Sequence, residues 1–214
     1  KYDNAGNYVF DVSIADSGVS LGSDIECIGG DIYVFGTTNS NGLNLDMVLI
    51  KYETVLGIHQ WTELMNGSGY ANDYGVQMIV DGMEFYLLGN SAQSGGSGWS
   101  IAKFDTNGDE YWMEDFFTGE TDFSGNQVMA FDPAGYVYIA ATISAATDYC
   151  RVLQIGAANG NQLWSSDFTA INDTHFSDIA TTSQGKILLS GTTLNNSGNM
   201  DIFIEHMDNA GDME

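Results

Sequence analysis

The run of residues that most resembles a metal site is a short acidic segment in the middle of the chain. Asp105, Asn107 and Asp109 place three oxygen-bearing side chains at alternate positions, the spacing with which calcium loops begin. A glycine comes earlier than in such a loop, and Phe116 stands where its closing Glu belongs. Two interpretations stay open, a calcium site and an ordinary turn between strands, and Ca²⁺ is the one cofactor that the sequence favours at all.

Other chemistry-bearing patterns are weak. Ser20 lies at the centre of a G-x-S-x-G match, Gly18–Gly22, but a nucleophile elbow needs a strand before it and a helix after it. The three histidines, His59, His175 and His206, show no zinc-type spacing, and no nucleotide-binding glycine loop occurs. We therefore expect no catalytic and no cofactor-binding residues.

Modification sites and thiols leave further questions open. Three N-x-S/T sequons, at Asn66, Asn172 and Asn195, are candidate glycosylation sites in predicted loops. Cys27 and Cys150 could form a disulfide or remain as two free thiols, and the sequence does not decide between them.

The overall charge excludes several classes of partner. The 214 residues carry 29 acidic and 5 basic side chains, a formal charge of −24, while 43% of the residues are hydrophobic. Such a chain can build a core, but nucleic acid and anionic membranes repel it. No apolar run reaches the roughly 18 residues that span a bilayer, so we expect no nucleic-acid partner and no membrane insertion.

The chain is an internal repeat. Phe10, Trp61, Trp112 and Trp164 recur at spacings of 51, 51 and 52, each four residues after a glycine. A second, apolar phrase recurs with the same period as Ile32–Gly36, Phe85–Gly89, Tyr136–Ala140 and Ile187–Gly191. Two unrelated phrases with one period indicate four units of about 51 residues.

Each unit predicts four short strands. In the first unit these are Asp24–Ile28, Ile32–Thr37, Met47–Tyr52 and Gln60–Leu64, which are rich in β-branched and aromatic residues. Gly, Asn and Asp lie in the turns between them, and no segment shows a sustained helical period. This pattern predicts an all-β fold, a β-propeller of four-stranded antiparallel blades, with the recurring aromatic residue packed between neighbouring blades.

Residues 1–214 are expected to form a single propeller array. Its units are approximately 16–66, 67–118, 119–171, and 1–15 together with 172–214, so the first residues could complete the last blade and close a four-bladed ring. However, the turn Asp3–Gly6 is duplicated at Asp208–Gly211, where a closed ring needs one copy. This overlap favours a segment of a larger propeller. A start at Lys1 without Met or signal peptide is expected of a processed form, an expressed fragment or a piece of a longer chain.

The repeated phrases resemble a known family. Ile32–Gly36, Met47–Tyr52, Gly57 and Trp61 are similar to the bacterial β-propeller repeats (SBBP-like repeats) first named for seven-bladed propellers. Asp46 and Asp201 also keep the family's Asp at the start of the third strand, whereas Gly98 and Tyr149 depart from it. The resemblance covers all four units and implies a secreted or cell-surface protein.

Three functions compete. The repeats, the acidity and the lack of catalytic motifs favour a non-enzymatic structural or adhesive module of the cell surface, with a protein or glycan partner or self-assembly. The alternative is a module that binds a glycan, a peptide or Ca²⁺ through loops on one face. A propeller enzyme ranks third, because an acidic cofactor would find one Arg and no recurring cation.

Overall fold

The computed structural model describes residues 1–13, 18–39, 42, 44–67, 71–93, 96–117, 127–144, 148–168 and 174–214. These residues form fifteen strands and no helix, which confirms the all-β prediction. Within this part of the chain there is accordingly no helix that could cross a membrane.

The strands form four antiparallel sheets in chain order. The first sheet contains β1 (Ser20–Ile28), β2 (Asp31–Thr38), β3 (Asp46–Glu53) and β4 (His59–Met65). The second contains β5 (Asp73–Asp81), β6 (Glu84–Gln93), β7 (Gly96–Asp105) and β8 (Glu110–Phe117). The third contains β9 (Gln127–Asp132), β10 (Tyr136–Ile143), β11 (Tyr149–Gly156) and β12 (Gln162–Phe168). The fourth contains three strands, β13 (Thr174–Thr181), β14 (Ile187–Leu194) and β15 (Met200–Met207).

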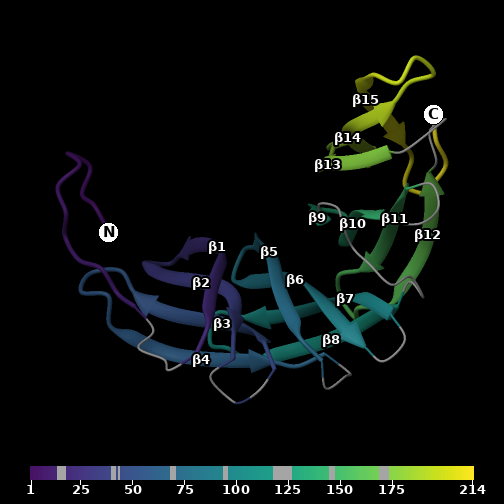
Figure 1. Ribbon diagram of the computed structural model, residues 1–214. Coiled ribbons are helices and arrows are strands. Elements are labelled where there is room, and N and C mark those ends of the chain that lie inside the picture. Colours follow the sequence, from purple (N-terminus) through teal and green to yellow (C-terminus); the bar gives the residue numbers. More distant parts are fainter. Residues whose placement is uncertain are drawn as a thin grey trace.

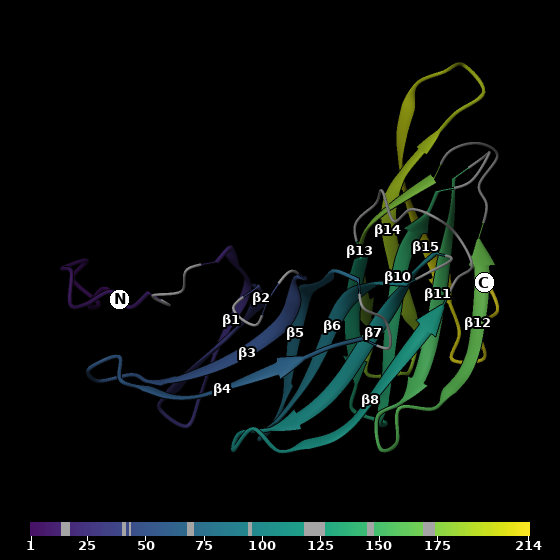
Figure 2. The same cartoon turned by 60° about the horizontal axis from the view of Figure 1, so that its bottom comes forward.

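The sheets follow one another along an open arc (Figure 1), and Figure 2 shows the same succession from a second direction. The first strand of each sheet contacts the first strand of the next, β1 with β5, β5 with β9 and β9 with β13. These strands therefore form the inner side of the arc. Blades stacked around a centre through their first strands are the arrangement of a β-propeller.

Hydrophobic side chains fill the three junctions between sheets. Phe35 and Leu49 of the first sheet form one buried cluster with Phe85 and Leu87 of the second. Two further clusters join the second sheet to the third and the third to the fourth. Because the second and third sheets bury apolar residues on both faces, they gain stability only when neighbours cover them.

The strand register corrects one detail of the predicted repeat. Tyr33 pairs with Lys51 and Tyr86 with Lys103, whereas the matching residue of the third unit is Tyr138, which pairs with Gln154. The third copy of the phrase is therefore Val137–Ala141 and not Tyr136–Ala140. The turn between β9 and β10, with the single Pro of the chain, is one residue longer than the turn between β5 and β6, and this shifts the copy.

Residues 1–13 lie against the first sheet. The Lys1 ammonium donates to the carbonyl of Thr54, and a side chain added at Gly57 would meet the Phe10 ring. Figure 1 shows the N-terminus at the opposite end of the arc from β15. The grouping of residues 1–15 with 172–214 stays a prediction.

Candidate functional site

The arc has two edges of different character. In every sheet the connection from the second to the third strand and the link to the next sheet lie at one edge, because the strands alternate in direction. We call this the loop edge, and Asn39, Leu45, Asn66 and Asn72 belong to it. The short turns at the other edge, such as residues 54–58, form the turn edge. Long connections at one edge of a scaffold are where propellers and similar folds place binding residues.

A histidine and an aspartate from neighbouring sheets meet at the loop edge. His175 is the second residue of β13, on the inner side of the arc, and Asp148 directly precedes β11. Nδ1 of His175 lies 3.9 Å from Oδ2 of Asp148, and the side chains are 40% and 21% exposed. An accessible imidazole beside a carboxylate is an arrangement that general acid–base catalysis uses.

Tyr74 occupies the same position in the second sheet. Tyr74 pairs with Asn90 on β6, as His175 pairs with Thr192 on β14. Its side chain keeps 39% of its surface exposed. The inner strands thus present an aromatic ring and an imidazole at one level of the arc, and an exposed Tyr ring can cover an apolar ligand face while its hydroxyl stays in water.

The single arginine of the chain is neutralised at this edge. Arg151 binds the two carboxylate oxygens of Asp167 at 2.6 and 2.8 Å, and its guanidinium lies 5.6 Å from the centre of the Tyr149 ring. Lys51 and Lys103 pair with Asp31 and Glu84 toward the turn edge. The loop edge therefore has an acidic character, which disfavours anionic ligands.

Two buried carboxyl groups lie at the loop edge, where β3 and β5 begin. Burial raises the pKa of Asp46 and is the main cause that raises the pKa of Asp73, to which the Asp115 and Asp46 carboxylates add. Oδ2 of Asp73 accepts the N–H of Gly67 at 2.8 Å. Asp73 is 1% exposed, so it anchors the link between sheets and is inaccessible to a ligand.

The predicted calcium segment forms a turn closed by its own side chain. Oδ1 of Asp105 accepts the N–H groups of Asn107 and Asp109 at 2.8 and 3.0 Å, and Oδ2 accepts the Asn107 amide. The same turn recurs at Asp3 and Asp208. Among the described residues, no group of three or more His, Cys, Asp or Glu side chains is arranged to hold a metal ion. Calcium binding by Asp105, Asn107 and Asp109 stays a prediction.

The other candidate residues are dispersed. Ser20 is the first residue of a strand, and its hydroxyl lies 2.9 Å from that of Thr38, so the Gly18–Gly22 match is no nucleophile elbow. Asn66 is exposed, and Asn172 lies outside the described residues. Asn195 donates from its amide to Asp201 and accepts the N–H groups of Ser197 and Asn199. Glycosylation of the sequons stays a prediction.

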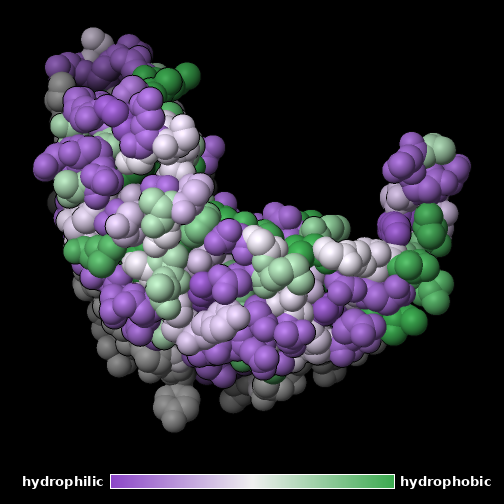
Figure 3. All heavy atoms as spheres, turned by 180° about the vertical axis from the view of Figure 1, so that it is seen from behind, coloured by the Kyte–Doolittle hydropathy of each residue, from purple (hydrophilic) through white to green (hydrophobic). Residues whose placement is uncertain are grey.

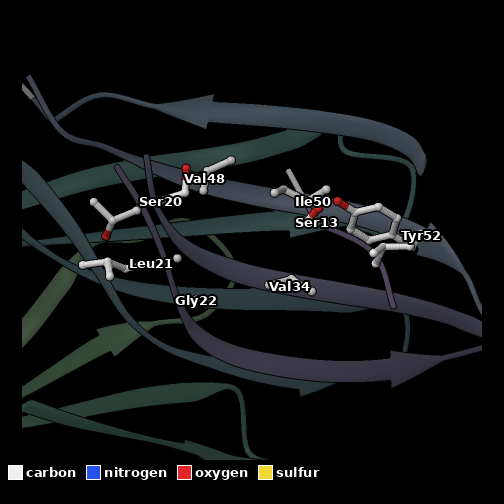
Figure 4. Close-up of a pocket in the computed structure, with 11 residues that line it drawn as sticks. Ser13, Ser20, Leu21, Gly22, Val34, Val48, Ile50 and Tyr52 are labelled. Carbon is white, nitrogen blue, oxygen red and sulfur yellow. The ribbon is translucent and has the colours of Figure 1, made fainter. Parts of the chain in front are cut away.

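A pocket opens on the outward face of the first sheet (Figure 4). It encloses about 340 Å³, and Leu21, Val34, Gly36, Val48 and Ile50 are among the residues that line it. Val12 and Ser13 border it from the N-terminal segment. In the other sheets the corresponding face is covered by the preceding sheet, whereas here the N-terminal segment borders the pocket and Val48 and Ile50 are 3% and 2% exposed.

Comparison with known proteins gives the fold. No family model and no curated protein matches the chain. Among solved structures, the chain resembles the quinohemoprotein alcohol dehydrogenase from Comamonas testosteroni, with 12% identity and a TM-score of 0.57 over 93% of this chain and 35% of that one. An N11 neuraminidase-like protein of A/flat-faced bat/Peru/033/2010 has 8% identity and a TM-score of 0.54, over 93% of this chain and 64% of that one. A europium-containing methanol dehydrogenase has 14% identity and a TM-score of 0.51, over 89% of this chain and 40% of that one.

These neighbours are propeller proteins, and the chain spans less than two thirds of each of them. The expectation of a non-enzymatic structural or adhesive module is wrong on these comparisons, because dehydrogenases stand among the neighbours. No motif in the sequence indicates that His175 and Asp148 lie near each other, because only the fold brings them together. At 8–14% identity the likeness establishes no particular reaction. The chain has the fold of four consecutive propeller blades.

Proposed function

We propose that this chain is part of the wall of a propeller enzyme that acts on a neutral, hydroxyl-rich substrate such as a glycan. The observation that carries the proposal is the His175–Asp148 pair, partly exposed on the inner side of the arc. In the proposed reaction His175 takes a proton from a hydroxyl or a water molecule. The Asp148 carboxylate stabilises the imidazolium that results.

The charge distribution supports the choice of substrate. Four of the five cations are lysines, and the remaining one, Arg151, is bound by Asp167. The described loop edge therefore offers little attraction to a phosphate or carboxylate group. The exposed Tyr74 ring suits the apolar face of a sugar ring. The names of two neighbours state oxidation of alcohols, which is also chemistry at a hydroxyl group.

Turnover of neutral polysaccharides, oligosaccharides and alcohols by the purified chain tests this proposal. Release of reducing ends is followed directly, and oxidation of the alcohol is followed separately by reduction of an added electron-acceptor dye. His175→Gln and Asp148→Asn are expected to lower kcat by about 10²–10⁴-fold, the usual contribution of an acid–base group. His59→Gln is the matched control, since His59 is exposed at the turn edge. Equal activity of the His175 and His59 variants, or no turnover by the wild type, would overturn the proposal.

Two further properties are part of this proposal. One is membership in the bacterial propeller repeat family, which the four repeated phrases support. The other is a location outside the cell, which the charge of −24 supports. A glycan partner is proposed for the same reasons as the substrate, namely the acidic loop edge and the exposed Tyr74 ring. Calcium at the Asp105 turn is a separate proposal, which calcium titration of the wild type and of Asp109→Asn tests.

A further inference from the structure

The last sheet exposes apolar side chains that the other sheets bury. Ile202 and Ile204 on β15 are 82% and 68% exposed. Strand register places them at the positions of Met47 and Leu49 on β3, which are 2% and 0% exposed because the second sheet covers them. Figure 3 shows from behind that the arc stays open and that hydrophobic residues are exposed on both of its arms. The exposed face of β14 and β15 thus lacks the neighbouring sheet that covers the same face of the other sheets.

The first sheet carries the complementary half. At the junction of the first and second sheets, the Met47 side chain lies directly over Gly89, where an added Cβ would meet Sδ at 1.9 Å. Gly36 holds the place of Gly89, since Gly36 pairs with Gly22 as Gly89 pairs with Gly75. Gly36 lines the open pocket of Figure 4. A Cβ added at Gly36 would meet the Leu21 carbonyl at 2.1 Å, so a side chain at the position of Ile202 would enter the pocket beside Gly36.

The N-terminal segment shows which kind of sheet fits there. Phe10 and Val12 pack against Gly57 as Trp61 and Glu63 pack against Gly108 in the next sheet. Residues 7–13 thus hold the place of the outer strand of a preceding sheet. The fourth sheet has no strand of the described chain on the outer side of β15.

We propose that a second copy of this chain docks head-to-tail, with its Ile202 entering the pocket at Gly36 and its β15 beside residues 7–13. The contact repeats the three junctions already formed within the chain, so its shape is set by the repeat. Lys1 and His206 hold equivalent positions in the repeat, so the hairpin of residues 1–6 moves aside on docking. Because each copy carries a charge of −24, association is expected to strengthen as salt screens the repulsion.

Light scattering coupled to gel filtration tests the proposal on the 214-residue chain. The mass is expected to rise from 23.1 kDa toward that of an assembly of two copies as the salt concentration rises to about 0.5 M. Ile202→Asp is expected to weaken association at least about tenfold, as the loss of a central apolar anchor does. Met83→Asp is the control, because Met83 is 58% exposed in the turn between β5 and β6, outside the junction. A monomer at every salt concentration overturns the proposal.

Cross-linking separates a second copy from closure within one chain. Leu21 lines the pocket and corresponds to Tyr74, whose carbonyl lies beside Met47 at Gly89. With Cys27 replaced by Ser, the pair Ile202→Cys and Leu21→Cys is expected to give a disulfide between chains. A disulfide within one chain would show a four-sheet ring, and no disulfide would show an open monomer; either result overturns the proposal.

Discussion

Gly160 lies directly against the indole of Trp112, so that a Cβ at Gly160 would be 2.7 Å from Cε3 of the ring. The glycine belongs to the third sheet's last turn and the indole to β8 of the second sheet. The same relationship joins Phe10 to Gly57 and Trp164 to Gly211. Each large aromatic residue is thus held by the next sheet, and its position requires a residue without a side chain.

Gly160→Ala is expected to be considerably more destabilising than Gly185→Ala. Both glycines have left-handed backbones, with φ of +71° and +77°, but no atom lies within 4 Å of a Cβ added at Gly185. The backbone term of about 1–2 kcal/mol is common to both variants, and the clash with Trp112 adds about 1–3 kcal/mol. Chemical denaturation of the two variants measures the difference. Equal losses of unfolding free energy would show that the contact has no energetic role.

The spacing of the aromatic residues and glycines predicted the fold, but it did not predict which glycine each aromatic ring contacts. In the sequence Trp112 follows Gly108 by four residues, yet the ring packs on Gly160 of the next unit. A period reveals equivalent positions, whereas contacts between units depend on how the sheets stack. The His175–Asp148 pair escaped prediction for the same reason, because its members lie on neighbouring sheets. Alignment of the first residues of β5 and β13 would have matched Tyr74 with His175.

The two thiols are expected to react at very different rates. Both cysteines are free, Cys27 is exposed and Cys150 is buried, which decides the question that the sequence left open. Burial raises the pKa of the Cys150 thiol to about 12, so almost no thiolate forms near neutral pH. A chromogenic disulfide reagent at about pH 8 should therefore titrate one thiol in the native protein and two after unfolding. Cys27→Ser should abolish the native reaction, and rapid modification of Cys150 would contradict the buried position.

Replacement of Asp73 by Asn is expected to make stability less dependent on pH. Burial raises the pKa of Asp73 in the folded chain, so the folded state holds this proton more tightly than the unfolded state does. The resulting stabilisation is complete below the unfolded pKa of about 3.9 and is lost as pH rises through the folded pKa. Asp73→Asn removes that loss, while its amide oxygen can still accept the Gly67 N–H. Thermal unfolding at several pH values should show a flatter profile for this variant, and an unchanged profile, like that of the exposed control Asp212→Asn, would refute the assignment.

Loss of the Tyr74 ring is expected to weaken substrate binding without unfolding the protein. Tyr74 is 39% exposed on the inner side of the arc, and a ring stacked on a sugar contributes about 1 kcal/mol, which corresponds to about a fivefold change in affinity. Tyr74→Ala should therefore raise KM by that factor while kcat stays close to the wild-type value, because the proposed proton transfer takes place at His175. Tyr111→Ala is the control, since Tyr111 is 55% exposed at the turn edge, far from the loop edge. A lower kcat with unchanged KM would place Tyr74 in the chemical step, and equal kinetics of the two Tyr variants would remove the ring from the site.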